Sequence, residues 1–385
     1  MSLTRAQIES RGHPVWAEVD LEAIRHNVRT LRAQASTAEV MGVVKGYAYG
    51  HGNPQSAVAM LQGGATRLGV ARVAEGLHLR EAGVNAPIHV FTEPPHGAAA
   101  TMLEHDLTPT VYTQPFAEAL AAAATERGTE ARVHLKVDTG MHRVGVPAGD
   151  VADAAKALRD LHGLVVEGAW SHLAVADVPN HPFTRTQMDL FAELTEQIEA
   201  AGIDLKFRHL ANSAATMSDP ETHLDLVRCG VASYGLWPSS DLLGTLDLRP
   251  ALALRARVNM AKTVPAGDGV SYGLRYSLSQ DSTIITVTAG YADGYDRRLS
   301  DRADILVRGQ RYRVSGTVCM DQFMSDVGSE EIEIGEVATL IGVDGNDSVP
   351  AEELAVHIGT INYEVTTRIP SRVPRIFLHE QGDAA

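Results

Sequence analysis

A lysine stands at the end of an apolar run, where a charged side chain is costly to bury. The run is MGVVK, residues 41–45, and it continues into GYAYGHG, so that Tyr49 follows Lys45 at a short fixed spacing. A lysine that is removed from water has a lowered pKa and can act as a nucleophile or a base. Such an amine can form a Schiff base with an aldehyde. The structural alternative is a strand-end lysine that extends its ammonium group into solvent.

The bulk composition limits the classes of partner. The chain has 385 residues and a formal net charge of −15, which argues against binding to nucleic acid or to an anionic membrane surface. No run of about 18 apolar residues is present that could span a membrane, and the first residues lack the apolar segment of a signal peptide. The two cysteines, Cys229 and Cys319, form no paired motif, as expected in a reducing compartment. We therefore expect a cytoplasmic protein of two domains.

Short apolar runs alternate with helical patterns from residue 14 to about residue 235. Candidate strands include VWAEV, VMGVVK, RLGVAR, IHVF, TPTVY, VHLKVD, LVVEGAWSH, FRHLAN and LDLVRCG. Between them, a helix is predicted after Asp20 and another from Pro115 to Gly128. This alternation predicts parallel β-α-β units, and their number favours a (β/α)8 barrel over an open doubly wound sheet. We expect a barrel over residues 1–245, with the first 12 residues or so packing on the second domain.

The pattern changes after about residue 245. Segments such as ALALRARVNMAKTV and ADILVRGQRYRVSGTVC alternate in polarity and are joined by glycine and aspartate turns. This pattern predicts a mostly antiparallel β domain over residues 246–385.

Further polar motifs follow the lysine motif in chain order. They are KVDTGMHRVG, SHLAVAD, LANSAA and VRCGVASYG in the expected barrel, and VSYG, GYADGYDRR, CMDQ and INYEV in the expected β domain. Together with VVKGYAYGHG, they resemble the motifs of the alanine racemase family over essentially the whole chain. Gly46 replaces the alanine that is usual in that family, and Tyr47 stands where a small polar residue is common.

The resemblance implies a fold-type III enzyme that depends on pyridoxal 5′-phosphate, with Lys45 as the lysine of the Schiff base. It implies catalytic roles for Lys45 and for Tyr272, the latter supplied by the partner subunit of a homodimer with shared active sites. The implied cofactor-binding residues are Lys45, Tyr49, His172, Asn212, Ser213, Arg228, Gly230, Val231 and Tyr363. Arg143 and Met320 would bind the substrate, and the implied supporting or entrance residues are Lys136, Asp177, Tyr291, Arg297, Asp321 and Ile361. No metal is implied, and in the family Lys136 can be carbamylated so that it orients Arg143.

These residue types suit the inversion of an α-carbon. Two bases on opposite faces remove and return the proton more directly than one base that must move across. An arginine such as Arg228 does not give up its proton, so it keeps the pyridine nitrogen neutral and makes the ring a weaker electron sink. The expected reaction interconverts L-alanine and D-alanine, which would supply D-alanine for peptidoglycan.

Several alternatives stay open at this point. Singly, Arg143 and Arg228 could form structural ion pairs, and His172 could be a buried structural histidine. A racemase of broader specificity, acting on serine or lysine, would share the fold and both bases. A non-enzymatic carrier of pyridoxal phosphate is a further alternative, although such carriers lack a β domain. The EPGR motif of the related decarboxylases and the HxC metal pair of the related aldolases and dehydratases are absent from the chain.

Overall fold

The computed structural model describes residues 4–380 of the chain, which divide into two compact units. One unit comprises residues 24–48 and 53–249, and the other comprises the first 23 residues, residues 49–52 and residues 250–385. The second unit therefore includes the N-terminal segment and the short loop 49–52, and both are far in the sequence from residues 250–385. No helix among the described residues is long and apolar enough to cross a membrane.

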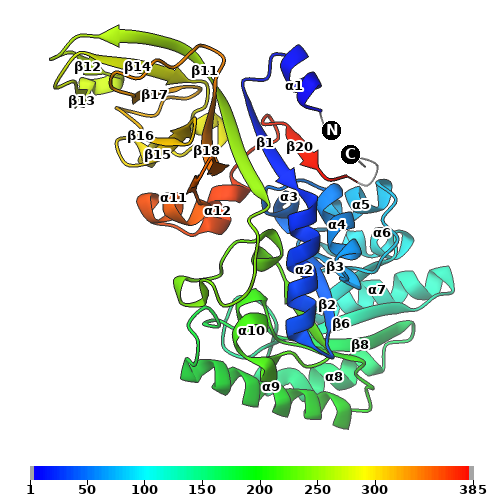
Figure 1. The fold of residues 1–385 in the computed structure, drawn as a ribbon. Coiled ribbons are helices and arrows are strands. Elements are labelled where there is room, and N and C mark those ends of the chain that lie inside the picture. The colour runs from blue at the N-terminus through cyan, green and yellow to red at the C-terminus, as the bar shows by residue number, and fades with distance from the viewer. Residues whose placement is uncertain (1–3, 381–385) are drawn as a thin grey trace. The chain divides into compact units, whose positions relative to one another are not determined.

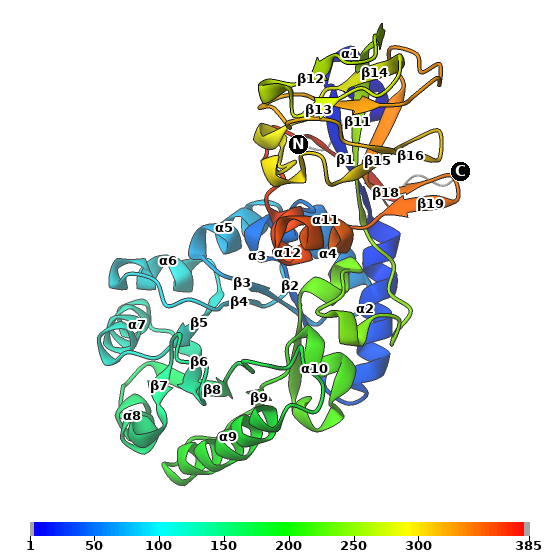
Figure 2. The ribbon, with the colours of Figure 1, turned by 90° about the vertical axis from the view of Figure 1, so that its left-hand side faces the viewer.

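The first unit is built on a ring of parallel strands with helices on its outside (Figure 2). In ring order the strands are β10 (Leu226–Cys229), β2 (Glu39–Val43), β3 (Arg67–Val70), β4 (Ile88–Val90), β5 (Leu107–Val111), β6 (Ala131–Asp138), β8 (Leu164–Trp170) and β9 (Phe207–His209). The short β7 (Val146–Pro147) pairs with β6. Backbone hydrogen bonds from Asp225 to Arg208 (3.1 Å) and from Arg228 to Ala211 (3.0 Å) join the last strand to the first. The ring is thus nearly closed, which confirms the predicted (β/α)8 barrel.

The barrel helices carry the expected start and stop signals. They are α2 (Leu21–Ala35), α4 (Gln55–Gln62), α5 (Val73–Glu81), α6 (Ala99–Glu104), α7 (Gln114–Arg127), α8 (Val151–Arg159), α9 (Pro182–Ala200) and α10 (Ser213–Ser218). Asp20 caps α2, because its carboxylate accepts hydrogen bonds from Glu22 N and Ala23 N. Gly128 ends α7 in the left-handed conformation, with φ of 66°. Both helices were predicted at these positions.

The second unit contains a mixed but mostly antiparallel sheet (Figure 1). Its strands are β1 (Val15–Asp20), β11 (Leu252–Val264), β14 (Ser282–Val287), β15 (Asp304–Val307), β16 (Gln310–Arg313), β17 (Phe323–Asp326), β18 (Val337–Asp344), β19 (Asp347–Val349) and β20 (Arg375–Leu378). The pair β12 (Gly269–Val270) and β13 (Tyr276–Ser277) forms a separate ribbon, and the helices are α1 (Arg5–Ser10), α11 (Ala351–Ile358) and α12 (Asn362–Thr367). The predicted β domain is therefore confirmed as a fold class.

The interpretation of VWAEV as a barrel strand was wrong. This segment is β1, which pairs antiparallel with β11 and parallel with β20 in the second sheet. Trp16, at its start, packs with Ile8 of α1 and with Ile376. The apolar pattern of β1 followed by a helix is the same in either sheet, because a strand that is buried on both faces has no polar side to identify its partner.

Candidate active site

Lys45 begins a short turn of left-handed backbone at the end of β2. The turn is α3 (Lys45–Tyr49), in which Gly46, Tyr47 and Ala48 have φ angles of 62°, 55° and 55°. The left-handed conformation costs roughly 1–2 kcal/mol for each residue with a side chain, because Cβ approaches a carbonyl oxygen. Glycine adopts it freely, which explains why Gly46 is well accommodated here. Strain of this kind concentrates at functional sites.

Glu75 holds this turn from the neighbouring helix α5. One carboxylate oxygen accepts a hydrogen bond of 2.7 Å from Gly46 N, and the other accepts from Ala71 N (2.8 Å) and Arg72 N (3.0 Å). Hydrogen bonds to a charged acceptor are stronger than neutral ones. Three backbone donors from two loops thus converge on one side chain, which fixes the position from which Lys45 extends.

Cationic groups gather at the carboxyl ends of the barrel strands, where the active sites of such barrels lie. Lys45 follows β2, Lys136 lies in β6, and Arg143 occupies the loop after β6. Burial lowers the pKa of the partly buried Lys45 ammonium, and the positive charge of Arg143 adds to this shift. Burial also lowers the pKa of His172 well below its usual range, with Arg228 as the largest charge effect. Such a concentration of positive charge favours the binding of an anion.

Arg228 is buried in β10 and is held by several acceptors. Its Nη1 donates to the carbonyl oxygen of His209 (2.8 Å), and its Nη2 donates to those of Ser171 (2.8 Å) and Leu210 (3.0 Å). Nη2 also lies 3.2 Å from Nδ1 of His172. Burial lowers the pKa of Arg228 to about 9, so the guanidinium group keeps its charge at neutral pH. The Nε–H group donates to none of the described residues, and it is the donor that remains for a ligand.

Lys136 is a second buried amine near the same strand ends. Its side chain is almost fully buried, and Nζ donates to Val137 O (2.6 Å) and Ser171 Oγ (3.4 Å). Nζ also lies 4.9 Å from the centre of the Trp170 ring. Burial lowers the pKa of Lys136 to about 7, and a large fraction of this amine is therefore neutral at physiological pH.

Asp138 and two glycines shape the loop that carries Arg143. The Asp138 carboxylate accepts hydrogen bonds from Gly140 N (3.0 Å) and His142 N (3.1 Å). Gly145 has φ of 127°, and a Cβ there would lie 2.9 Å from the backbone nitrogen of Asp138. Arg143 itself is exposed and forms no hydrogen bond or ion pair with another described residue. Its guanidinium group can therefore bind a carboxylate.

Ser213, Gly230 and Val231 meet where the turns after β9 and β10 approach each other. Ser213 Oγ accepts a hydrogen bond of 2.8 Å from Gly230 N. Asn212 caps α10 with its side chain, and Val231 begins the 3-10 turn η4 (Val231–Tyr234). The first amide groups of a helical turn have no acceptor within the turn. This corner combines a hydroxyl group with backbone donors, as phosphate groups require.

In the second unit, Tyr272 lies on a strained and exposed turn. It begins η6 (Tyr272–Leu274), and 74% of its surface is accessible. Ser271, the preceding residue, has φ of 66°, and its hydroxyl group donates to Thr317 O (2.7 Å). Thr317 Oγ1 in turn donates to Tyr272 O at 2.9 Å. The backbone of Tyr272 is thus fixed while its phenol group faces solvent.

Met320 and Tyr291 are brought together by backbone pairing. Tyr291 N donates to Cys319 O (3.1 Å), and a Cβ on Gly290 would overlap the Met320 carbonyl group. Both side chains are exposed. Asp321 forms an ion pair with Arg372 at 2.8 Å.

The other predicted residues of the second unit lie on two further segments. Tyr363, in α12, has its ring centre 6.1 Å from that of Tyr49, and burial raises the pKa of Tyr49. Ile361, which precedes α12, and Arg297, in the turn η8 (Arg297–Leu299), are both exposed. The structure groups each set of residues within its own unit, and the functional roles of all of them stay predictions.

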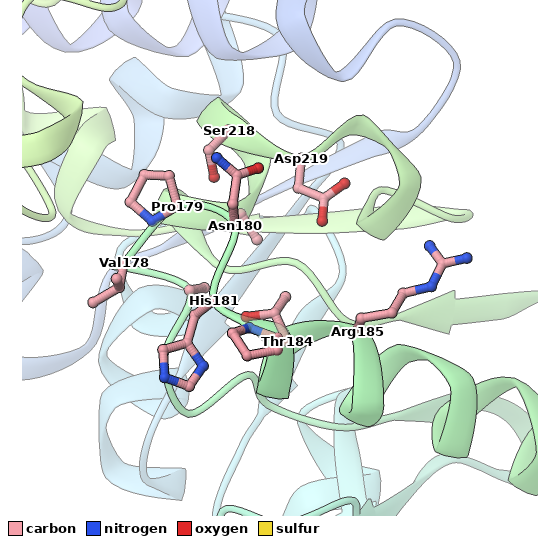
Figure 3. A pocket seen from close by; sticks show the side chains of 11 residues that line it. Val178, Pro179, Asn180, His181, Thr184, Arg185, Ser218 and Asp219 are labelled. Carbon is pink, nitrogen blue, oxygen red and sulfur yellow. The ribbon is translucent and has the colours of Figure 1, made fainter.

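Asp177 is exposed and lies between two residues that line a pocket of the first unit. The pocket is formed by the loop before α9, the first turn of α9 and one side of α10 (Figure 3). Its lining includes His181, Thr184, Arg185 and Asp219. None of the predicted cofactor-binding residues lines it, so this hollow is separate from the cationic cluster.

Two family models match the chain, the N-terminal domain of alanine racemase over residues 19–238 and its C-terminal domain over residues 251–377. The chain belongs to the alanine racemase family. An alanine racemase from Desulforamulus reducens is 44% identical over 369 residues, which are 95% of this chain and 99% of the relative. The crystal structure of alanine racemase from D-cycloserine-producing Streptomyces lavendulae has 42% identity and a TM-score of 0.91, covering 95% of this chain and 97% of that one. A histidine racemase from Leuconostoc mesenteroides is also similar, with 30% identity, a TM-score of 0.85, and coverage of 95% and 98%.

The alanine racemase family depends on pyridoxal phosphate, and this assignment confirms the predicted family, enzyme class and cofactor. The residues of the first unit fit this group. Lys45 supplies an amine with a lowered pKa, and Arg228 keeps one free donor, which is of the kind that a pyridine nitrogen accepts. The Ser213 hydroxyl group and the Gly230 amide, which bond each other in this structure, are groups of the kind that bind a phosphate. No group of three or more metal-binding side chains occurs among the described residues.

Two supporting side chains were missed by the sequence analysis. Glu75 was not identified because a glutamate near a helix start is common and indicates only a helix cap. Gln187, on α9, is fully buried, and its amide group bonds Ala174 N (2.8 Å), His172 O (3.0 Å) and Thr139 Oγ1 (3.1 Å). It joins the loops after β6 and β8, but no sequence motif indicates it.

Proposed function

We propose that the chain interconverts L-alanine and D-alanine with two bases, Lys45 on one face of the substrate and Tyr272 of a second copy on the other. The observation that carries this proposal is the position of the Lys45 amine. It extends from a strained, clamped turn, has a lowered pKa, and lies within a cluster of cations at the carboxyl ends of the barrel strands.

The residues around Lys45 would bind and orient both ligands. When bound, pyridoxal phosphate supplies an electron-withdrawing ring that stabilises the negative charge left on the α-carbon. Ser213, Gly230 and Val231 would hold its phosphate group. Arg143 would bind the substrate carboxylate, which is consistent with its exposed guanidinium group and the fixed loop beneath it.

Tyr272 is proposed to act in a homodimer. In the single chain 74% of the surface of Tyr272 is accessible, although the backbone of its turn is fixed by Thr317. A tyrosine with a pKa of about 10 is a weak base, so it requires cationic neighbours to act near neutral pH. The cationic cluster of a second copy would provide them.

The choice of substrate rests on the entrance residues. Asp177, Tyr291, Arg297 and Tyr363 follow the pattern of racemases for small substrates, which favours alanine. The second candidate is a broader or different substrate range, because a histidine racemase has the same fold at 30% identity. Tyr47, which departs from the family motif and is exposed, is the residue of the lysine turn that could alter the range. The non-enzymatic carrier is disfavoured, because the family match includes the C-terminal domain.

We further propose a biosynthetic role in the cytoplasm, with D-alanine supplied to peptidoglycan. The activity is tested by incubating the purified protein and pyridoxal phosphate with each enantiomer of alanine and measuring the other by chiral chromatography. Serine, lysine and histidine serve as competing substrates. The highest kcat/KM is expected for alanine, and equal kcat/KM for lysine or histidine would overturn the choice of substrate.

A further inference from the structure

A line of buried polar groups crosses the interior of the barrel to Arg228. This buried relay consists of Glu167 in β8, His134 in β6, His209 in β9 and Arg228 in β10. Figure 2 shows β6, β8 and β9 side by side. Both histidine side chains are fully buried. Arg228 Nη1 lies 3.2 Å from His209 Nδ1, and His209 Nε2 lies 2.7 Å from His134 Nδ1. His134 Nε2 lies 3.5 Å from Glu167 Oε1, which is its nearest charged partner among the described residues.

The relay contains two hydrogen bonds, from Arg228 to His209 and from His209 to His134, and its Arg228 end determines the direction of both. A guanidinium group only donates, so His209 Nδ1 must accept and His209 must carry its proton on Nε2. That proton is donated to His134 Nδ1, so His134 must also carry its proton on Nε2. His134 Nε2 has no hydrogen-bond partner among the described residues, and the Glu167 carboxylate, 3.5 Å away, is the nearest acceptor for its proton. One tautomer of each histidine satisfies all three contacts.

Packing and electrostatics support neutral rings in fixed orientations. His209 stacks on Trp170 with centres 5.7 Å apart, and His134 stacks on Phe207 at 5.8 Å. Burial lowers the pKa of both histidines below its usual range. The pKa of Glu167 is lowered, mainly by its contact with His134. With neutral imidazoles between a cation and an anion, both hydrogen bonds of the relay run in the same direction, from Arg228 toward Glu167.

We propose that Glu167 is a positioning residue that, through the two histidines of the buried relay, keeps a nitrogen lone pair directed at Arg228. The lone pair holds Nη1 on the side of the guanidinium group that faces the barrel interior. Nε is thereby kept toward the side where the proposed function places the pyridine nitrogen. The expected effect on catalysis rests on the proposed function. The proton pattern of the two histidines does not, because it is a property of the folded chain.

The proton pattern can be measured directly. In the full chain with 15N-labelled histidine, long-range 1H–15N spectra distinguish protonated from unprotonated ring nitrogens. His134→Gln and His209→Gln variants assign the signals. We expect an unprotonated Nδ1 and a protonated Nε2 in both residues, with and without added pyridoxal phosphate. A protonated Nδ1 in either residue, or an imidazolium, would overturn the proposal even if the enzyme is fully active.

The role of Glu167 is tested by Glu167→Leu and Glu167→Gln, with Glu130→Gln as the matched control. Glu167 and Glu130 both form an ion pair with Arg132, at 3.8 Å and 3.3 Å, but Glu130 is exposed and lies outside the relay. Glu167→Leu removes the terminal acceptor, so we expect a mixture of tautomers at His134 and a loss of kcat of about tenfold, or ~1.4 kcal/mol. Glu167→Gln keeps an acceptor oxygen, so it should retain more of the original His134 tautomer and more of kcat than Glu167→Leu. It also provides a second test if the leucine variant misfolds. Histidine spectra and kcat that match those of Glu130→Gln in both variants would contradict the proposal.

Discussion

The Glu75 carboxylate accepts a hydrogen bond of 2.7 Å from the backbone N–H of Gly46, the residue that follows Lys45. The same carboxylate caps its own helix α5 through Ala71 N and Arg72 N. Glu75 thus has two functions. It caps its own helix, as glutamate often does, and it also fixes a left-handed turn of a neighbouring loop. The position of the Lys45 amine depends on this clamp, because the turn is strained and would relax without it.

Replacing Glu75 by alanine should weaken both stability and catalysis. Three backbone donors lose a charged acceptor, and we expect a loss of about 2–4 kcal/mol in the free energy of unfolding. The turn should also become more mobile, so kcat should fall more than the KM for alanine rises. Urea denaturation and steady-state kinetics measure the two effects. Glu81→Ala, at the exposed end of the same helix, is the control, and equal effects of both variants would show that the clamp is unimportant.

Replacing Tyr272 by phenylalanine should distinguish the contributions of the two bases, which are proposed to act on opposite faces of the substrate. The equilibrium constant of a racemase is unity by symmetry, so kcat/KM falls equally in both directions, by about 100-fold or more if a catalytic base is lost. Exchange of the α-proton with solvent deuterium distinguishes the bases. Lys45 should still exchange the α-proton of the enantiomer whose proton faces it, whereas exchange into the other enantiomer should be lost.

The control for this experiment lies in the same ribbon. Tyr276 donates to Asp326 at 2.8 Å and is only partly exposed, so Tyr276→Phe should leave both exchange rates nearly unchanged. Retention of both exchange reactions in Tyr272→Phe would remove Tyr272 from the mechanism. A loss of specific activity on dilution would support its action across a dimer interface, and a fully active monomer would contradict it.

Lys136 should make the stability of the chain depend on pH in the alkaline range. Burial lowers its pKa from 10.5 to about 7, so between these values the unfolded state binds more protons than the folded state. Unfolding free energy should therefore rise with pH across this range, by linkage. Lys136→Met should lose this part of the slope, as measured by urea denaturation in carbon-dioxide-free buffers. The exposed Lys156→Met is the control, and identical slopes for both variants would show that the Lys136 amine is not perturbed.

Carbamylation of Lys136 requires the neutral amine, so it is expected to follow the same pH range. In 13C-bicarbonate, a carbamate signal should appear above about pH 7 and be absent from Lys136→Met. A signal that persists in that variant would place the carbamate elsewhere.

The barrel, the β domain and the lysine motif could be predicted from the sequence. The alternation of strand and helix patterns and the helix caps are signals that a short stretch of sequence contains. The sequence was not sufficient for β1, whose partners β11 and β20 are distant in sequence. The left-handed turn at Lys45 was also not foreseen, since its conformation depends on a contact with Glu75.

The interior of the barrel shows a second limit. In β6, His134 and Lys136 alternate with Val133, Leu135 and Val137, and all five are buried. An alternation of polar and apolar residues normally predicts a polar face toward solvent. In β6, His134 and Lys136 face the barrel interior, although the interiors of such barrels are mostly apolar, so the pattern identifies a strand but not which side is enclosed. The buried relay was missed for this reason.

The attachment of pyridoxal phosphate to Lys45 is tested most directly by borohydride reduction of the loaded enzyme followed by peptide mass mapping. The two buried or partly buried amines near the cationic cluster, Lys45 and Lys136, both have a lowered pKa, so either could react. We predict that the reduced pyridoxyl group is found on the peptide that contains Lys45, and that Lys45→Ala loses the imine absorption whereas Lys156→Ala keeps it. A pyridoxyl group on Lys136, or an imine absorption that persists in Lys45→Ala, would contradict the central claim.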